Sequence, residues 1–274
     1  MKHPMGITII LVVLFVIAQL FGVFVFSKYM DINTKKPIKD TPIGQIQSSD
    51  VKSLNWEFIV VIIAAILIGT GICLYLIRNS KTNLLKIWIA IALFVNLLIA
   101  TGAFFTPLIA LIVTFVLTIL RMNLINWKYY LYLHNSTEII LYGGFATAFA
   151  FILNIWTVIV LLIAISVYDM IAVWKSKHMV KLAKGMIKNK IFSGLLIKYQ
   201  GKKAILGGGD IAFPLLASVV MFRNFGWISS LCVIAGSTIA LVVLLTMSQK
   251  GKFYPAMPYL SAGVFIGILF AVFL

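Results

Sequence analysis

Runs of about 20 apolar residues recur along this chain, and most of its charged residues fall between them. A run of this length is what a helix needs to cross the hydrocarbon core of a bilayer. Only 11% of the residues are charged, whereas soluble domains have about 25%. The sequence therefore predicts an all-α integral membrane protein that crosses the membrane many times.

We expect nine transmembrane helices within a single polytopic domain, residues 1–274. Their ranges are 5–27, 57–77, 84–105, 106–120, 129–150, 152–174, 204–222, 227–247 and 255–274. Turn residues place two of the breaks, at Thr106-Pro107 and near Asn154. The first six helices thus occupy 1–174, a basic connection occupies 175–203, and the last three helices occupy 204–274.

The basic residues predict the orientation. Most of the 23 lysine and arginine residues fall on one set of alternate connections, including 175–203. Cytoplasmic connections carry such an excess, so we expect the amino terminus in the cytoplasm and the carboxyl terminus outside. Topology accounts for the net charge of +16, which does not indicate a nucleic-acid partner. In the 175–203 connection, lysines alternate with apolar residues, which predicts either an amphipathic stretch on the inner leaflet or a solvated linker.

Carboxylates are scarce, and two of them stand out. After Glu57 the chain holds only Glu138, Asp169 and Asp210 as acids. A carboxylate in a spanning helix costs at least roughly 2.5 kcal/mol and is a functional-site hypothesis. At about 1.5 Å per residue, Asp169 near the end of the inward sixth helix and Asp210 near the start of the outward seventh reach similar depths. Two adjacent carboxyls can share a proton, one acting as a general base on water and the other as a general acid on a carbonyl.

Other polar residues predict less. Cys73 and Cys232 form no C-x-x-C, and the three histidines form no H-E-x-x-H, so we expect neither a metal nor a cofactor. Glu138 could line a water-filled approach or pair with His134 one helical turn earlier. We favour a structural role for it.

Three short motifs remain, and each has a physical use. They are Tyr168-Asp169, the run Gly207-Gly208-Gly209-Asp210, and Pro255-Ala256-Met257-Pro258 at the head of the last helix. Glycines before Asp210 allow close approach of another backbone. Prolines leave the preceding backbone extended, so that it could pair with an unwound substrate as an added strand.

From Tyr168 to Pro258, the motifs and their order resemble presenilin and the signal peptide peptidases. These are intramembrane aspartyl proteases with the motifs Y-D, G-x-G-D and P-A-L. The resemblance implies that Asp169 and Asp210 are catalytic. It also implies supporting or substrate-docking roles for Tyr168, Gly207, Gly208, Gly209, Pro255, Ala256, Met257 and Pro258.

Three departures from the family pattern are visible. Met257 stands where leucine is usual, and Gly208 fills the variable position at which presenilins carry leucine. The chain is also short, with no large soluble region. We interpret it as a prokaryotic, archaeal homologue that works in the cell membrane without accessory subunits.

The expected function is hydrolysis of peptide bonds within the transmembrane helices of other proteins. The expected partners are those helices and membrane lipid, and a homo-oligomer stays open. Two alternatives are a proton-coupled transporter using the same carboxylates and a prepilin-type G-x-G-D peptidase. The latter usually carries a lysine soon after the aspartate, whereas Ile211 to Pro214 contain none.

Overall fold

The structure, a computed structural model, describes residues 4–31, 37–38, 40–42, 56–79, 81–123, 127–175, 185–187, 192–249 and 254–274. Much of the 28–56 and 175–203 connections therefore lies outside the described residues, including the lysine-rich part for which the sequence predicts an amphipathic stretch.

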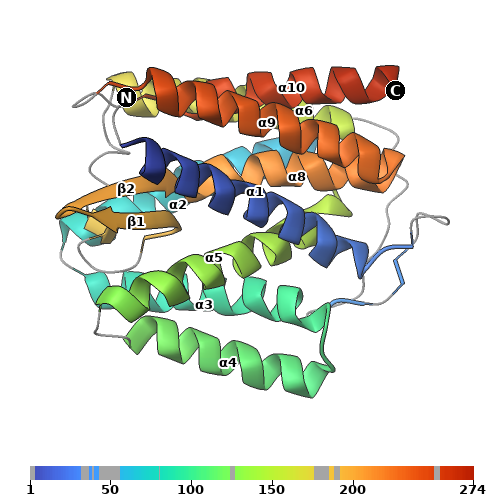
Figure 1. The fold of residues 1–274 in the computed structure, drawn as a ribbon. Coiled ribbons are helices and arrows are strands. Elements are labelled where there is room, and N and C mark those ends of the chain that lie inside the picture. The colour runs from blue at the N-terminus through green and yellow to red at the C-terminus, as the bar shows by residue number, and fades with distance from the viewer. Residues whose placement is uncertain are drawn as a thin grey trace.

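Long helices lie side by side and make up most of the described chain (Figure 1). They are α1 (Met5–Ser27), α2 (Trp56–Arg78), α3 (Thr82–Gly102), α4 (Pro107–Asn123), α5 (Trp127–Ala150), α6 (Ile155–Met170), α8 (Gly208–Phe225), α9 (Trp227–Met247) and α10 (Met257–Phe273). Within the described residues, five helices are both long and apolar enough to cross a membrane, and α4 and α10 are shorter apolar helices. The prediction of a helical membrane protein is confirmed at this level.

The sequence-based breaks between helices agree with the structure. The third and fourth helices separate between Gly102 and Pro107. Asn154 is the N-cap of α6, and its side-chain oxygen accepts a 2.7 Å hydrogen bond from the Thr157 N–H. This bond satisfies one of the free donors at the start of a helix, which is why asparagine favours that position.

A β-hairpin corrects the all-α prediction. Strands β1 (Gly194–Tyr199) and β2 (Lys202–Gly207) pair antiparallel, with Gly194 opposite Gly207. Gln200 and Gly201 connect them, with φ values of 42° and 73°. Positive φ at both positions is typical of a type I′ turn, whose twist matches that of the two strands.

The hairpin also moves the start of the helix that carries Asp210. The sequence places this helix at 204–222, but residues 204–207 belong to β2 and α8 begins at Gly208. Asp210 therefore lies in the first turn of α8. At the end of α6, the chain continues as a π-helix, η1 (Ile171–Lys175), so the predicted end near Trp174 agrees with the structure.

Helix α8 lies at the centre of the packing. It contacts α1, α5, α6, α9 and α10, and its residues from Ile211 to Phe222 are mostly buried. Helices α9 and α10 approach so closely that a Cβ on Gly236, Gly263 or Gly267 would overlap the backbone of the other helix. Small residues at such crossings allow close helix packing in membranes.

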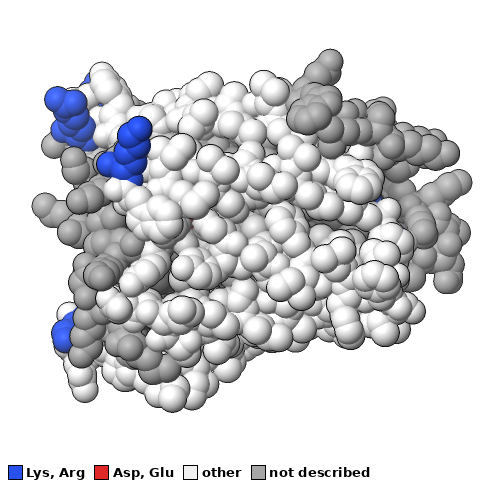
Figure 2. Space-filling model, turned by 90° about the horizontal axis from the view of Figure 1, so that it is seen from above, with Lys and Arg blue, Asp and Glu red and all other residues white. Residues whose placement is uncertain are grey.

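The surface is consistent with a bilayer environment. Figure 2 shows a broad face free of charge over α9 and α10, with Lys and Arg gathered at one end of it. This is the end at which the hairpin lies and at which α1, α8 and α10 begin (Figure 1). The opposite end holds the end of α10.

Candidate active site

Asp169 ends α6 and contacts the first turn of α10. Its side chain is buried, with 8% of its surface exposed. Oδ2 accepts a 3.1 Å hydrogen bond from the Met257 N–H, and the backbone of Ala256 is a further donor. One turn earlier, the hydroxyls of Ser166 and Ser261 lie 2.9 Å apart and join the same two helices. The free N–H groups of a helix start favour an anion, so α10 provides a site for the Asp169 carboxylate.

The Pro255–Pro258 segment creates that helix start. Ala256 is the N-cap of α10, and Pro258 lies in its first turn. Proline is well suited to this position because its missing N–H would have no partner within the helix. Pro255 and Met257 are buried. The segment therefore presents backbone donors to Asp169, as well as opening the last helix as the sequence predicts.

Asp210 occupies the third position of α8, and its side chain points back toward the helix start. Its carboxyl accepts a hydrogen bond from the backbone N–H of Gly207, the N-cap residue. A Cβ on Gly207 would lie only 3.0 Å from Oδ2 of Asp210. This is the reciprocal half of a capping box, in which an acid at the third position satisfies the N-cap N–H.

The two aspartates lie on helices that pack against each other. Helix α6, which carries Asp169, packs against α8, which carries the half-buried Asp210. Each carboxyl lies at the amino end of a helix, Asp169 at α10 and Asp210 at α8. Tyr168 is half-buried beside Asp169 at the end of α6. The helix ends that carry the two acids are therefore neighbours, whereas the pairing of their carboxyls for acid–base chemistry on one substrate bond stays a prediction.

The three glycines differ in how closely they are surrounded. A Cβ on Gly208 would lie 3.0 Å from both the Ser193 and the Tyr142 hydroxyl oxygens. A Cβ on Gly209 would make only ordinary contact with the Phe213 ring, at 3.6 Å. The position that varies in the G-x-G-D pattern is thus the more confined one in this chain.

Sequence reasoning missed a polar cluster behind the hairpin. Glu138 is fully buried and forms an ion pair with Arg121 of α4, which is also buried. The predicted partner, His134, instead places Nε2 2.8 Å from the carbonyl oxygen of Gly194. Since Glu138 has 0% of its surface exposed, it does not line a water-filled approach. The sequence does contain a signal for this pair. Arg121 and Glu138 are rare charges of opposite sign on successive apolar segments, and buried charges are normally paired.

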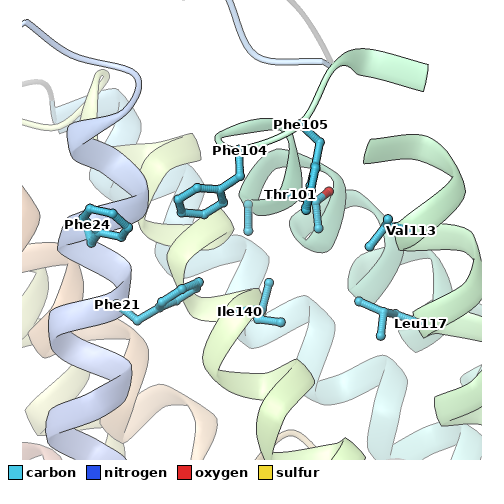
Figure 3. Close-up of a pocket in the computed structure, with 9 residues that line it drawn as sticks. Phe21, Phe24, Thr101, Phe104, Phe105, Val113, Leu117 and Ile140 are labelled. Atoms are coloured by element: carbon cyan, nitrogen blue, oxygen red, sulfur yellow. The ribbon is translucent and has the colours of Figure 1, made fainter. Parts of the chain in front are cut away.

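The aspartates lie apart from the apolar pocket shown in Figure 3. This recess of about 310 Å³ lies among α1, α3, α4 and α5 and is lined largely by Phe21, Phe24, Phe104 and Phe105. Its hydroxyl group, on Thr101, already contacts Thr114 at 2.9 Å. The pocket offers no acid or base for chemistry. Among the described residues, no three His, Cys, Asp or Glu side chains gather as metal ligands.

Comparison with known families identifies the class of this protein. The model of a family described as signal-peptide peptidase, presenilin aspartyl protease matches residues 12–201, a range that includes Tyr168 and Asp169. Because the match covers more than half of the chain, the protein belongs to this family. It is a presenilin-family intramembrane aspartyl protease and an integral, multi-pass membrane protein.

Solved structures of similar fold support the assignment. A presenilin family intramembrane aspartate protease in space group C222 superposes with a TM-score of 0.68 at 21% identity, covering 97% of this chain and 98% of that one. A presenilin family protease structure in space group P2 gives a TM-score of 0.65 at 22% identity, covering 96% of each chain. Comparison with curated proteins gave no match.

Proposed function

We propose that Asp169 and Asp210 are the catalytic pair and that they hydrolyse peptide bonds within transmembrane helices of substrate proteins. The observation that supports the proposal is that α6 packs against α8 while each carboxyl lies at the amino end of a helix, Asp169 at α10 and Asp210 at α8. These are the only aspartates after the first long connection. Both belong to motifs that the family resemblance marks as catalytic.

The chemistry needs one proton shared between the carboxyls. The ionised member takes a proton from water as the water oxygen attacks the substrate carbonyl carbon. The protonated member donates to the carbonyl oxygen and stabilises the tetrahedral intermediate. When that intermediate collapses, the C–N bond breaks and the nitrogen receives a proton, leaving a carboxylic acid and an amine. Neither a metal nor a covalent enzyme intermediate is required.

We propose that the substrate binds to the backbone next to the two carboxyls. A peptide bond inside a helix is shielded, so the substrate must unwind locally before water can attack it. We propose that Pro255–Pro258 helps to dock the unwound segment, with Tyr168 and the glycines Gly207 to Gly209 supporting the site. The partners are then substrate helices and lipid, with a homo-oligomer as a further possibility.

The proposal includes a topology of nine crossings. The described chain contains nine helices of 16 residues or more, and in Figure 2 the basic side chains of the described residues lie mainly at the hairpin end. The positive-inside rule then assigns that end to the cytoplasm, with the carboxyl terminus outside. Cleavage would occur near the cytoplasmic third of the substrate helix, in the cell membrane of a prokaryote, which we propose to be an archaeon.

The decisive experiment uses purified enzyme in liposomes with a labelled single-span substrate. Asp169→Asn and Asp210→Asn keep the side-chain shape but remove the acid, and each should lower turnover by at least about 10²–10⁴-fold, the range for general acid–base catalysis. Asp40→Asn, in an exposed acid of the first long connection, is the matched control and should cleave normally. Retained cleavage in either site variant would refute the catalytic pair. Proton flux without any product would instead support the transporter alternative.

A further inference from the structure

Glu138 is the acceptor at the centre of a buried polar cluster that the proposed chemistry does not use. Its carboxylate is paired with Arg121 of α4. Oε2 also accepts hydrogen bonds from the Tyr142 hydroxyl (2.5 Å), the Gly194 N–H (3.0 Å) and the Ser193 hydroxyl (3.2 Å). Four donors for one carboxylate offset the cost of burying its charge.

The cluster joins two helices to the segment that enters the hairpin. Arg121 lies on α4 and Tyr142 on α5, whereas Ser193 and Gly194 lie where the chain enters β1. Arg121 also reaches the carbonyl oxygen of Phe192, at 3.5 Å. Residues 192–194 are therefore held against α4 and α5 by side chains from both helices.

One turn before Glu138, the same face of α5 also holds β1. Nε2 of His134 contacts the Gly194 carbonyl oxygen at 2.8 Å. The Asn135 side chain exchanges two hydrogen bonds with the backbone of Leu196, at 2.9 and 3.0 Å. The first half of β1, from Gly194 to Leu196, is thus fixed to α5.

The cluster reaches the start of α8 within one further contact. The carbonyl oxygen of Ser193 accepts a 3.2 Å hydrogen bond from the Gly208 N–H, and Gly194 pairs with Gly207 across the hairpin. Gly208 is the first residue of α8 and lies two positions before Asp210. A shift in residues 193–194 would therefore move the helix turn that carries Asp210.

Gly208 shows how closely the cluster fits this turn. The Tyr142 and Ser193 hydroxyls occupy the space next to Gly208 that a side chain would need. At this position the related presenilins carry leucine, by the resemblance described above. In this chain the cluster takes the space of that side chain.

We propose that Glu138, with Arg121 and Tyr142, positions Asp210 for catalysis through Ser193 and Gly208. These are positioning residues, because none of them is proposed to touch the substrate. The inference rests on the proposed function, since it assumes that Asp210 is catalytic. A small displacement of a catalytic group lowers the rate by up to about 10²-fold while leaving ground-state binding intact.

The test measures KM and kcat. A transition-state-analogue inhibitor of aspartyl proteases titrates the active sites, so that kcat is expressed per site. Tyr142→Phe removes one hydroxyl, and Ser193→Ala removes another from the same carboxylate. Arg121→Gln combined with Glu138→Gln removes both charges together, so neither charge is left buried alone. Each variant should lower kcat about tenfold or more and change KM less than about twofold.

Thr114→Val is the matched control. Thr114 lies on α4 like Arg121, is fully buried, and its hydroxyl contacts Thr101 at 2.9 Å. Its loss should lower the melting temperature and leave kcat per titrated site unchanged. This separates positioning from a general loss of folded enzyme.

A double-mutant cycle in kcat per titrated site tests whether the cluster acts through Gly208. Gly208→Ala should be less harmful in the Tyr142→Phe background, because one of the two hydroxyls that it would crowd is gone. Wild-type kcat in Tyr142→Phe and Ser193→Ala, additive effects in the cycle, or a change confined to KM would each overturn the inference. If those variants cleave normally while Asp210→Asn does not, the catalytic pair stands and only the positioning role fails. Cleavage by Asp210→Asn would overturn both.

Discussion

The backbone N–H of Met257 donates a 3.1 Å hydrogen bond to Oδ2 of Asp169, joining residues 88 positions apart in the chain. The Asp169 carboxyl near the end of α6 is thereby hydrogen-bonded to the first turn of α10. This gives the proline-rich segment a structural role that does not depend on substrate, because it fixes the donors that face Asp169.

Replacing Pro255 should loosen the donors without unfolding the protein. Pro255→Ala frees one backbone torsion, at a cost to the ordered segment of about 0.4–1 kcal/mol. We expect kcat to fall about two- to fivefold, measured with the liposome assay, and the helical circular dichroism to stay unchanged. Pro4→Ala, at an exposed proline that caps α1, is the control. Equal turnover in the wild type, Pro255→Ala and Pro4→Ala would argue against a role for Pro255.

Alanine at the two glycines before Asp210 should give different results. Gly208→Ala places a methyl group 3.0 Å from the Tyr142 and Ser193 hydroxyls, so α8 or those side chains must shift. Overpacking of this kind costs about 1–3 kcal/mol, and kcat should fall about tenfold or more. Gly209→Ala meets only the Phe213 ring at 3.6 Å.

The Gly209→Ala variant is therefore expected to fold with a melting temperature close to that of the wild type. Thermal unfolding in detergent measures this, alongside turnover in liposomes. If Gly209→Ala is stable but inactive, Gly209 is needed for approach of the substrate backbone. If it is unstable, the contact assigned to Phe213 is wrong.

The pH dependence of cleavage should be bell-shaped. With both carboxyls protonated there is no base to activate water, and with both ionised there is no acid to protonate the carbonyl oxygen. Activity is thus lost on both sides of an optimum, and the two limbs belong to the pair and not to either residue alone. Initial rates in liposomes buffered equally on both sides would measure the profile, with helical content followed at each pH. A rate that stays constant toward either extreme would contradict a shared-proton pair.

Packing between α9 and α10 should be sensitive to single methyl groups. A Cβ on Gly263 would overlap the Gly236 carbonyl and the Ala240 side chain, so Gly263→Ala must push the helices apart. We expect a loss of about 1–3 kcal/mol in stability. Gly71→Ala is the control, since nothing lies within 4 Å of a Cβ there. Equal melting temperatures for the two variants would show that the helix crossing adapts freely.

The protein class and the candidate acids were accessible from the sequence because they depend on local patterns and on helix direction. Asp169 and Asp210 stand out among apolar residues, and the direction of each predicted helix places both acids near the same membrane surface, although α8 begins four residues later than predicted. Asn154 is recognisable as a helix start because an asparagine oxygen satisfies free N–H groups there. These inferences need only the residues near each position.

The hairpin and the Glu138 cluster were not accessible in the same way. The strand residues, such as Leu195 and Leu196, are as apolar as those of a helix, and a short apolar run does not distinguish the two. The turn depends on positive φ at Gln200, a residue that rarely adopts it. Glu138 finds its partners 17 and 56 positions away, at Arg121 and Gly194, and no local spacing encodes such contacts.

The glycine crossing of α9 and α10 has a mechanical consequence. No layer of side chains separates the two backbones near Gly263. We therefore expect α9 and α10 to tilt in the membrane as one unit. Met257 lies six residues from Gly263, or about 9 Å along the axis, so the tilt is transmitted to the donor that holds Asp169. A thinner or thicker bilayer changes helix tilt, and we therefore expect the rate of hydrolysis to vary with acyl-chain length even for an identical substrate.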